Sequence, residues 1–192
     1  MALGGRGFVS VGAVVACCAL AAACTPEPAS TGTPLPTPAA TTPTESQIER
    51  QMRLDYEAAE QAYKAALGEQ ERQAGLGIAR LTPALKASAT GEYLDLVLKA
   101  LRYARERHWR SSGSTRIFGV VPNGWQARAV RLTACEDSSG VQLINKAGTD
   151  VTRQKTRKYV QNLTVENVDG HWKVADISTT VVKSFEGQPC AA

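Results

Sequence analysis

The sequence predicts an α+β domain in which N-terminal helices pack on one face of an antiparallel sheet. Two observations indicate this class. Between residues 45 and 112, apolar residues recur at the helical spacings of three and four, whereas between 115 and 183 β-rich runs alternate with turn residues. The last two runs are joined by Asp169-Gly170, the strongest short-range signal for a β-hairpin. Helices followed by an antiparallel meander are typical of α+β domains.

Residues 1–23 have the features of a secretory signal. Arg6 precedes an uncharged apolar stretch from Phe8 to Ala23, which ends in three alanines. This stretch is shorter than the roughly 20 residues that span a bilayer, so an uncleaved N-terminal membrane helix is the less favoured alternative. In either case we expect the C-terminal domain to lie outside the cytoplasmic membrane.

Cys24 directly follows the small residues, an arrangement that resembles the lipobox of bacterial lipoproteins. In that family the cysteine is diacylated on its sulfur and becomes the new N-terminus. The family prefers leucine three residues before the cysteine, where this chain has Ala21, and a second match ends at Cys17. We favour Cys24 because the composition changes there from apolar to linker-like. The resemblance implies lipidation of Cys24 and anchoring to the outer face of the cell membrane.

Residues 24–44 form a predicted tether. After the cysteine, this segment contains six prolines and seven threonines and shows no hydrophobic period. Such a composition cannot bury a core, so we expect an extended and solvated spacer. The folded domain is predicted to occupy residues 45–192.

Three helices are predicted in the first half of this domain. The first has Ser46 as its N-cap and continues to about Arg72, where glycines follow. A short second helix follows Thr82-Pro83, because proline suits the first helical position. The third begins after Thr90-Gly91 and ends by Ser111. The apolar faces expected for the first and third helices are Ile48, Met52, Tyr56, Ala59, Tyr63 and Ala66, and Leu94, Val97, Leu98, Leu101 and Ala104.

Five strands are predicted after the helices. They are Thr115–Val121, Gln126–Cys135, Val141–Asn145, Val151–Val168 and Trp172–Lys183. The turns between them are predicted at Pro122-Asn123-Gly124, Asp137–Gly140, Ala147-Gly148 and Asp169-Gly170.

Charge and cysteine content narrow the function classes. The formal net charge of +4 is too small, and too little clustered, to favour a nucleic-acid partner. Cys17 and Cys18 belong to the signal, which leaves Cys135 and Cys190 as a pair in an exported domain. We expect these two to form a disulfide, with two free buried thiols as the alternative.

The closing strand, Asp169-Gly170-His171-Trp172-Lys173-Val174-Ala175-Asp176, and the order of the elements resemble the nuclear transport factor 2-like superfamily. The nearer likeness is to small actinobacterial lipoproteins of that superfamily, which have a Thr/Pro tether. The resemblance implies three helices folded against a strongly curved sheet to form a cone, with Trp172 packed between sheet and helices. Members include isomerases, cyclases, dehydratases, secretion-channel parts and binding modules, so the fold does not determine the function.

Few residues suggest catalysis. The histidines, His108 and His171, are expected at the surface, at a helix end and in a hairpin. Asp176 is a weak catalytic candidate because alternation places it on the same strand face as Trp172. If that strand face points into the cone, Asp176 could act as a catalytic base opposite a tyrosine such as Tyr103. Otherwise Asp176 is expected to be a hydrogen-bonded structural carboxylate. The sequence has no phosphate loop, nucleophile elbow or metal-ligand spacing, so no cofactor or metal is expected.

A basic surface is also predicted. Arg153, Lys155 and Arg157 alternate along the fourth predicted strand and would share one face. Such a stripe can contact anionic lipid, cell-wall polymer or an acidic protein, or can simply be the solvated side of a sheet edge.

Together these features favour a surface-anchored, non-catalytic module that binds an unidentified protein or small molecule. One alternative is an isomerase- or cyclase-type enzyme that uses the cone pocket. Another is an accessory component of a secretion or conjugation apparatus.

Overall fold

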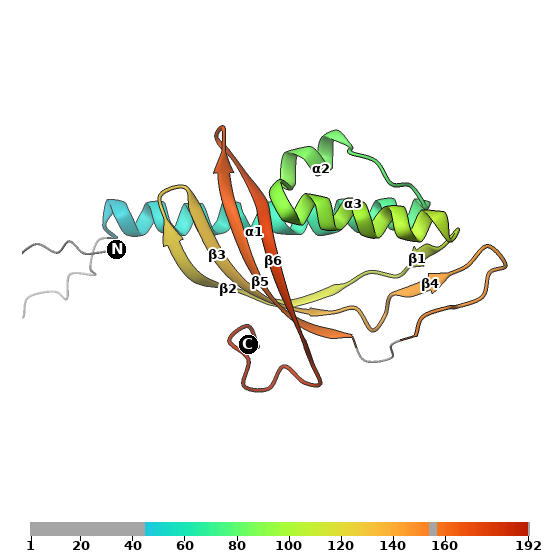
Figure 1. Ribbon diagram of the computed structural model, residues 1–192. Helices are drawn as coiled ribbons and strands as arrows, with labels where there is room; N and C mark the ends of the chain where they lie inside the picture. Colours follow the sequence, from blue (N-terminus) through green and yellow to red (C-terminus); the bar gives the residue numbers. More distant parts are fainter. Residues whose placement is uncertain (1–44, 154–156, 192) are drawn as a thin grey trace, which may run out of the picture. The chain divides into compact units, whose positions relative to one another are not determined.

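The computed structural model describes residues 45–153 and 157–191 (Figure 1). The predicted signal, Cys24 and the tether lie outside these residues, and so does Lys155. Their interpretations stay predictions. No helix within the described ranges is both long enough and apolar enough to cross a membrane.

The first helix, α1 (Gln47–Leu76), begins as predicted with Ser46 as its N-cap. Ser46 and Glu49 form a capping box, in which each side chain accepts a hydrogen bond from the other's backbone N–H. The helix extends past Arg72 and is capped at Gly77. Its buried face includes Ala59, Tyr63 and Ala66, as expected, but Ile48 is exposed.

The other two helices are α2 (Pro83–Ser88) and α3 (Gly91–Glu106). The side chain of Thr82 caps α2 by accepting a hydrogen bond from the backbone N–H of Leu85. In α3 the fully buried residues are Tyr93, Val97 and Leu101. Leu94 and Leu98, also predicted to face the core, are half-buried against it.

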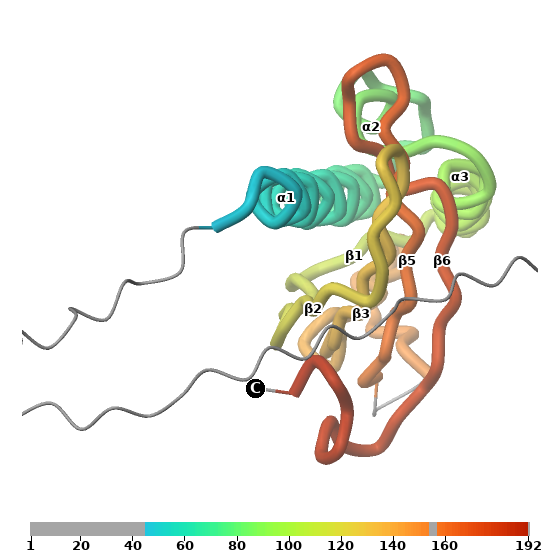
Figure 2. The backbone as a smooth tube through the Cα atoms, turned by 90° about the vertical axis from the view of Figure 1, so that its left-hand side faces the viewer, coloured from blue at the N-terminus to red at the C-terminus, as the bar shows by residue number. Residues whose placement is uncertain are grey.

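The main sheet has four antiparallel strands in the order β2-β3-β5-β6. Their bounds are Arg116–Gln126, Ala129–Asp137, Lys158–Val168 and His171–Val182. A separate two-stranded ribbon pairs β1 (Arg110–Ser112) with β4 (Gln142–Ile144). The three helices pack on one face of the main sheet, whose strands bend along their length (Figures 1 and 2).

The turns are partly as predicted. Asp169 and Gly170 both have positive φ, 54° and 82°, which a tight hairpin between β5 and β6 requires. The turn predicted at Pro122-Asn123-Gly124 is wrong, because these residues lie inside β2 next to a register shift. The chain instead turns at residues 127–128.

The C-terminal tail packs on one part of the sheet face opposite the helices (Figure 2). Cys190 forms the predicted disulfide with Cys135, and their Cα atoms are 5.5 Å apart. Phe185 and Val160 are buried beside this disulfide. The tail passes so close to β2 that a Cβ atom at Gly119 would collide with the carbonyl oxygen of Cys190. A glycine at this position is therefore required for the tail to lie here.

A β-bulge changes the register of β6. Thr164 of β5 pairs with Asp176, whereas the next residue, Val165, pairs with Val174, so Ala175 is an extra residue. The bulge reverses the alternation of side chains that follow it. Ile177 consequently packs against the core and Asp176 is exposed on the other face.

A cleft between the helices and the sheet

A cleft of about 340 Å³ lies between α1, α3 and the inner face of the sheet. Its walls combine apolar and polar side chains. The apolar ones are Leu67, Leu96, Val97, Ala100 and Ile177, and the polar ones are Tyr63, Gln70, Tyr93, Glu136, Gln161 and Thr179. This volume lies at the small end of the range for small-molecule sites, and the mixture of walls is typical of them.

In the described part of the chain, Glu136 is the only carboxyl group that lines this cleft. It continues the inward-facing alternation of β3, after the buried residues Val130, Leu132 and Ala134. Its side chain is 5% exposed. The strand therefore carries a carboxyl group to the end of an otherwise apolar face.

Hydrogen bonds connect Glu136 to three structural elements. The phenol of Tyr63 in α1 donates to Oε1 of Glu136, and Nε2 of Gln161 in β5 donates to Oε2 at 3.0 Å. The hydroxyl of Thr179 in β6 donates to Oε1 of Gln161 at 2.6 Å. This chain crosses β3, β5 and β6 and fixes the orientation of each polar group at the cleft.

Burial raises the pKa of Glu136, and the hydrogen bond from Gln161 opposes this effect only in part. Within the described ranges, Glu136 has no ion-pair partner. Burial also raises the pKa of Tyr93 at the same cleft. Glu136 therefore holds its proton to a higher pH than an exposed glutamate does. Once protonated, it can donate a hydrogen bond as well as accept one.

The residues predicted for catalysis do not meet at this cleft. Asp176 is exposed on the opposite face of the sheet, so its assignment to the same face as Trp172 is wrong. The cause is the bulge at Ala175, which no glycine or proline marks in the sequence. Tyr103 is 50% exposed and does not line the cleft. Both histidines are exposed, as expected, and Trp172 is half-buried against the core.

The basic stripe predicted along a strand from Val151 is not carried by β5, which begins at Lys158. Lys155 lies outside the described residues, so its part in the stripe stays a prediction. Arg153 and Arg157 instead lie in the segment before the strand. They line a second cleft, of about 460 Å³, together with Tyr103, Arg107 and Trp109. The prediction thus placed these arginines on the wrong element.

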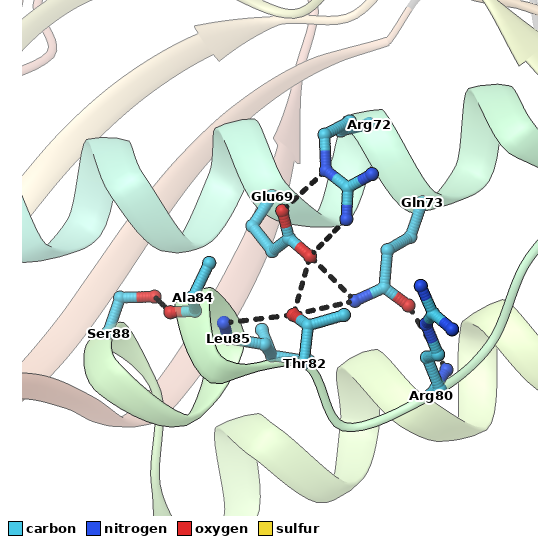
Figure 3. Close-up of polar contacts among 8 residues, drawn as sticks. All are labelled: Glu69, Arg72, Gln73, Arg80, Thr82, Ala84, Leu85 and Ser88. Carbon is cyan, nitrogen blue, oxygen red and sulfur yellow. Dashed lines mark hydrogen bonds and ion pairs between the residues drawn. The ribbon is translucent and has the colours of Figure 1, made fainter.

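A buried polar cluster joins α1 to α2 (Figure 3). The carboxylate of Glu69 accepts hydrogen bonds from the Arg72 guanidinium, at 2.7 and 2.8 Å, and from the hydroxyl of Thr82 at 2.6 Å. The side-chain amide of Gln73 donates to Glu69 at 3.0 Å, and its oxygen accepts from the backbone of Arg80. The bonds from Arg72 dominate in lowering the pKa of Glu69 to about 2. Since every group is paired, this cluster holds the connection between the helices.

The alternation along β3 is the sequence signal for Glu136. Val130, Leu132, Ala134 and Glu136 have the same parity along one strand, so a carboxyl group on the core face was readable. What the sequence does not show is that Tyr63 and Gln161 lie within reach of it. Among the described residues, no three His, Cys, Asp or Glu side chains are grouped to hold a metal ion.

Comparison with solved structures addresses the fold. A candidate aromatic ring hydroxylase from Novosphingobium aromaticivorans matches with a TM-score of 0.50 and 10% identity, over 69% of this chain and 92% of that one. This match shows a shared fold, in which helices pack on one face of an antiparallel sheet as the nuclear transport factor 2-like resemblance implies. A candidate dehydratase of the NTF2-like family from Streptomyces avermitilis matches with a TM-score of 0.41 and 16% identity, over 69% and 99% of the two chains.

The intermembrane space region of the chloroplast protein ARC6 matches this domain with a TM-score of 0.46 and 13% identity, over 67% and 98% of the two chains. No protein-family model and no curated protein matches the sequence. At these identities the likeness concerns the fold alone, so the function is argued from the clefts.

Proposed function

We propose that the protein is a lipid-anchored, extracytoplasmic binding module whose NTF2-like domain binds a small, mostly apolar molecule in the cleft beside Glu136. The observation that carries this proposal is the oriented row of polar groups, Glu136, Gln161 and Thr179, beside the apolar side chains of the cleft. Apolar walls supply affinity for the body of a ligand, and fixed polar groups select its orientation.

The ligand is expected to be uncharged where it meets Glu136. A buried carboxyl group with a raised pKa favours a partner that shares hydrogen bonds with it. A ligand anion placed there would face the developing charge of Glu136 without a compensating cation. Hydroxyl, carbonyl and amide groups are all compatible with this site.

The proposed location rests on the apolar stretch before Cys24 and on the disulfide. Disulfides such as Cys135–Cys190 persist in oxidising compartments outside the cytoplasm. We expect Cys24→Ser to leave the protein unprocessed or to release it from the membrane fraction, while Cys17→Ser changes little. Labelling with a fatty acid that persists in Cys24→Ser would contradict lipidation at this residue.

Binding can be tested with the neutral fluorescent probe N-phenyl-1-naphthylamine. We expect its emission to rise with the full-length protein, and Ala100→Phe to abolish that rise by filling the cleft. Ala65→Phe is the matched control, because Ala65 is also an exposed helical alanine but does not line the cleft. Equal binding by both variants would contradict the proposal.

A second candidate is an enzyme that transfers a proton through Glu136. The observation in its favour is a carboxyl group with a raised pKa inside a cleft. However, both oxygens of Glu136 accept hydrogen bonds from the protein, which favours a fixed binding group over a mobile base. If Glu136→Gln binds a ligand normally but fails to convert it, the enzyme is the better description.

A further inference from the structure

The end of the domain formed by the last turn of α3 and the β1–β4 ribbon carries an unusual concentration of cations. Two clefts meet there, of about 630 Å³ and 460 Å³, and Trp109 lines both. Six lysine or arginine side chains line one or the other. They are Arg105, Arg110 and Lys146 in the larger cleft, and Arg107, Arg153 and Arg157 in the smaller one.

Among the residues that the structure describes, no acidic side chain lines either cleft. Within residues 45–153 and 157–191, none of the six cations takes part in an ion pair. Hydrogen bonds from Thr152 are the main cause of the lowered pKa of Asp150, and the charge of Arg157 contributes less. Asp150 does not line the clefts. The cations are therefore left largely uncompensated by the domain itself.

The negative end of the α3 dipole explains only part of this pattern. Cations near a helix C-terminus are stabilised by the helix carbonyl groups, and this accounts for Arg105 and Arg107. Arg110, Lys146 and Arg153 come from other segments and gain nothing comparable from α3. The helix dipole therefore does not account for their convergence.

Two of the arginines are held in place before any ligand arrives. The guanidinium of Arg107 lies 3.5 Å from the centre of the Tyr103 ring and 5.8 Å from that of Trp109. Tyr103 and Trp109 in turn contact each other edge to face at 5.9 Å. This aromatic pair restrains Arg107 at the smaller cleft, so less side-chain entropy is lost when it binds an anion.

Arg157 supplies the observation that points to a ligand. One terminal nitrogen donates to the carbonyl oxygen of Val141, which fixes the side chain. Its Nε is buried and has no hydrogen-bond partner, the single such side-chain atom in the described part of the chain. An unpaired buried donor is costly, so a hydrogen-bond acceptor that reached it would be bound favourably.

We propose that the smaller cleft binds a phosphate group of a soluble ligand, through Arg107, Arg153 and Arg157. Guanidinium groups bind phosphate oxygens with paired, charge-assisted hydrogen bonds, and phosphate can accept from the unpaired Nε of Arg157. The buried position of this donor favours a small recessed group over a flat lipid surface. The site is separate from the Glu136 cleft, since the two share no lining residue.

Isothermal titration of the full-length protein with inorganic pyrophosphate tests this site. We expect binding that weakens about tenfold or more in Arg107→Gln and in Arg153→Gln, the loss expected when a charge-assisted hydrogen bond is removed. Arg102→Gln is the control, because Arg102 is an exposed α3 arginine that lines neither cleft. Arg153 is itself exposed, so its replacement leaves the fold intact.

Three results would overturn the proposal. The first is the absence of pyrophosphate binding by the unmodified protein. The second is an equal loss in Arg102→Gln and Arg153→Gln, which would indicate general charge attraction. The third is an Arg153-dependent association with vesicles containing phosphatidylglycerol that pyrophosphate does not displace, which would make the ligand a membrane surface.

Discussion

Tyr63 in α1 donates a hydrogen bond to the carboxyl group of Glu136 in β3, and these two residues are separated by 73 positions in the sequence. This bond joins α1 to the sheet at the cleft between them. The polar end of the cleft therefore depends on contacts that form only when helix and sheet pack together.

Glu136 should make stability depend on pH in a defined direction. Because burial raises its pKa, the folded protein binds this proton more tightly than the unfolded chain does. The stabilisation is fully present below the ordinary value of 4.5 and is lost as the pH rises through the raised pKa. Relative to Glu136→Gln, the melting temperature of the unmodified protein should fall as pH rises through this range.

The control for this measurement is Glu92→Gln, because Glu92 is exposed near the start of α3. Its melting temperature should follow that of the unmodified protein at every pH. A constant difference between Glu136→Gln and the unmodified protein would show that the Glu136 pKa is not raised.

Glu69 should act in the opposite direction and at lower pH. Its pKa is lowered from 4.5 to about 2, chiefly by Arg72, so its stabilisation is present above 4.5 and is lost as the pH falls toward 2. In urea unfolding at neutral pH, Glu69→Gln should therefore have a lower free energy of unfolding than the unmodified protein. This difference should be smaller at acid pH. If the difference in the free energy of unfolding grew as the pH fell, ionised Glu69 would not stabilise the cluster shown in Figure 3.

The disulfide should contribute most of the stability of the tail. Replacing Cys135 and Cys190 together with serine opens a loop with a sequence separation of 55 residues. On the chain-entropy estimate this should lower the free energy of unfolding by about 4 kcal/mol. Limited proteolysis should then cut the variant after β6 first. Unchanged stability, together with two reactive thiols in the native protein, would rule the bond out.

The bulge at Ala175 predicts which side chains of β6 contribute to the stability of the fold. Val174 is fully buried, so Val174→Ala should cost about 2 kcal/mol through lost apolar burial and the cavity it leaves. Asp176 is exposed, so Asp176→Ala should change stability by no more than about 0.5 kcal/mol. If chemical denaturation showed Asp176→Ala to cost more than Val174→Ala, the side chains of β6 would alternate without a bulge, as expected from the sequence.

Local signals predicted much of the fold. Ser46 and Thr82 cap helices where expected, and Asp169-Gly170 makes the expected hairpin, because caps and tight turns depend on a few adjacent residues. Pro122-Asn123-Gly124 misled the prediction, since the same residues are compatible with an irregular strand. Propensity alone does not separate these two outcomes.

The candidate site was less predictable, because it depends on register and on long-range packing. One extra residue at Ala175 moved Asp176 from the inner to the outer face. Glu136 was readable as inward-facing, but its raised pKa depends on how completely the helices bury it. The smaller cleft, of about 460 Å³, brings Arg107 beside Arg153 and Arg157. No local sequence pattern reveals that these two segments lie together.

A methyl NMR titration with N-phenyl-1-naphthylamine tests most directly whether the cleft beside Glu136 binds a small uncharged molecule. We predict shifts of the Leu67, Val97 and Ile177 methyl signals, which line the cleft. The methyl signals of Val160, under the C-terminal tail, should not change. Shifts confined to residues outside the cleft, or no shifts at saturating probe, would contradict binding in this cleft.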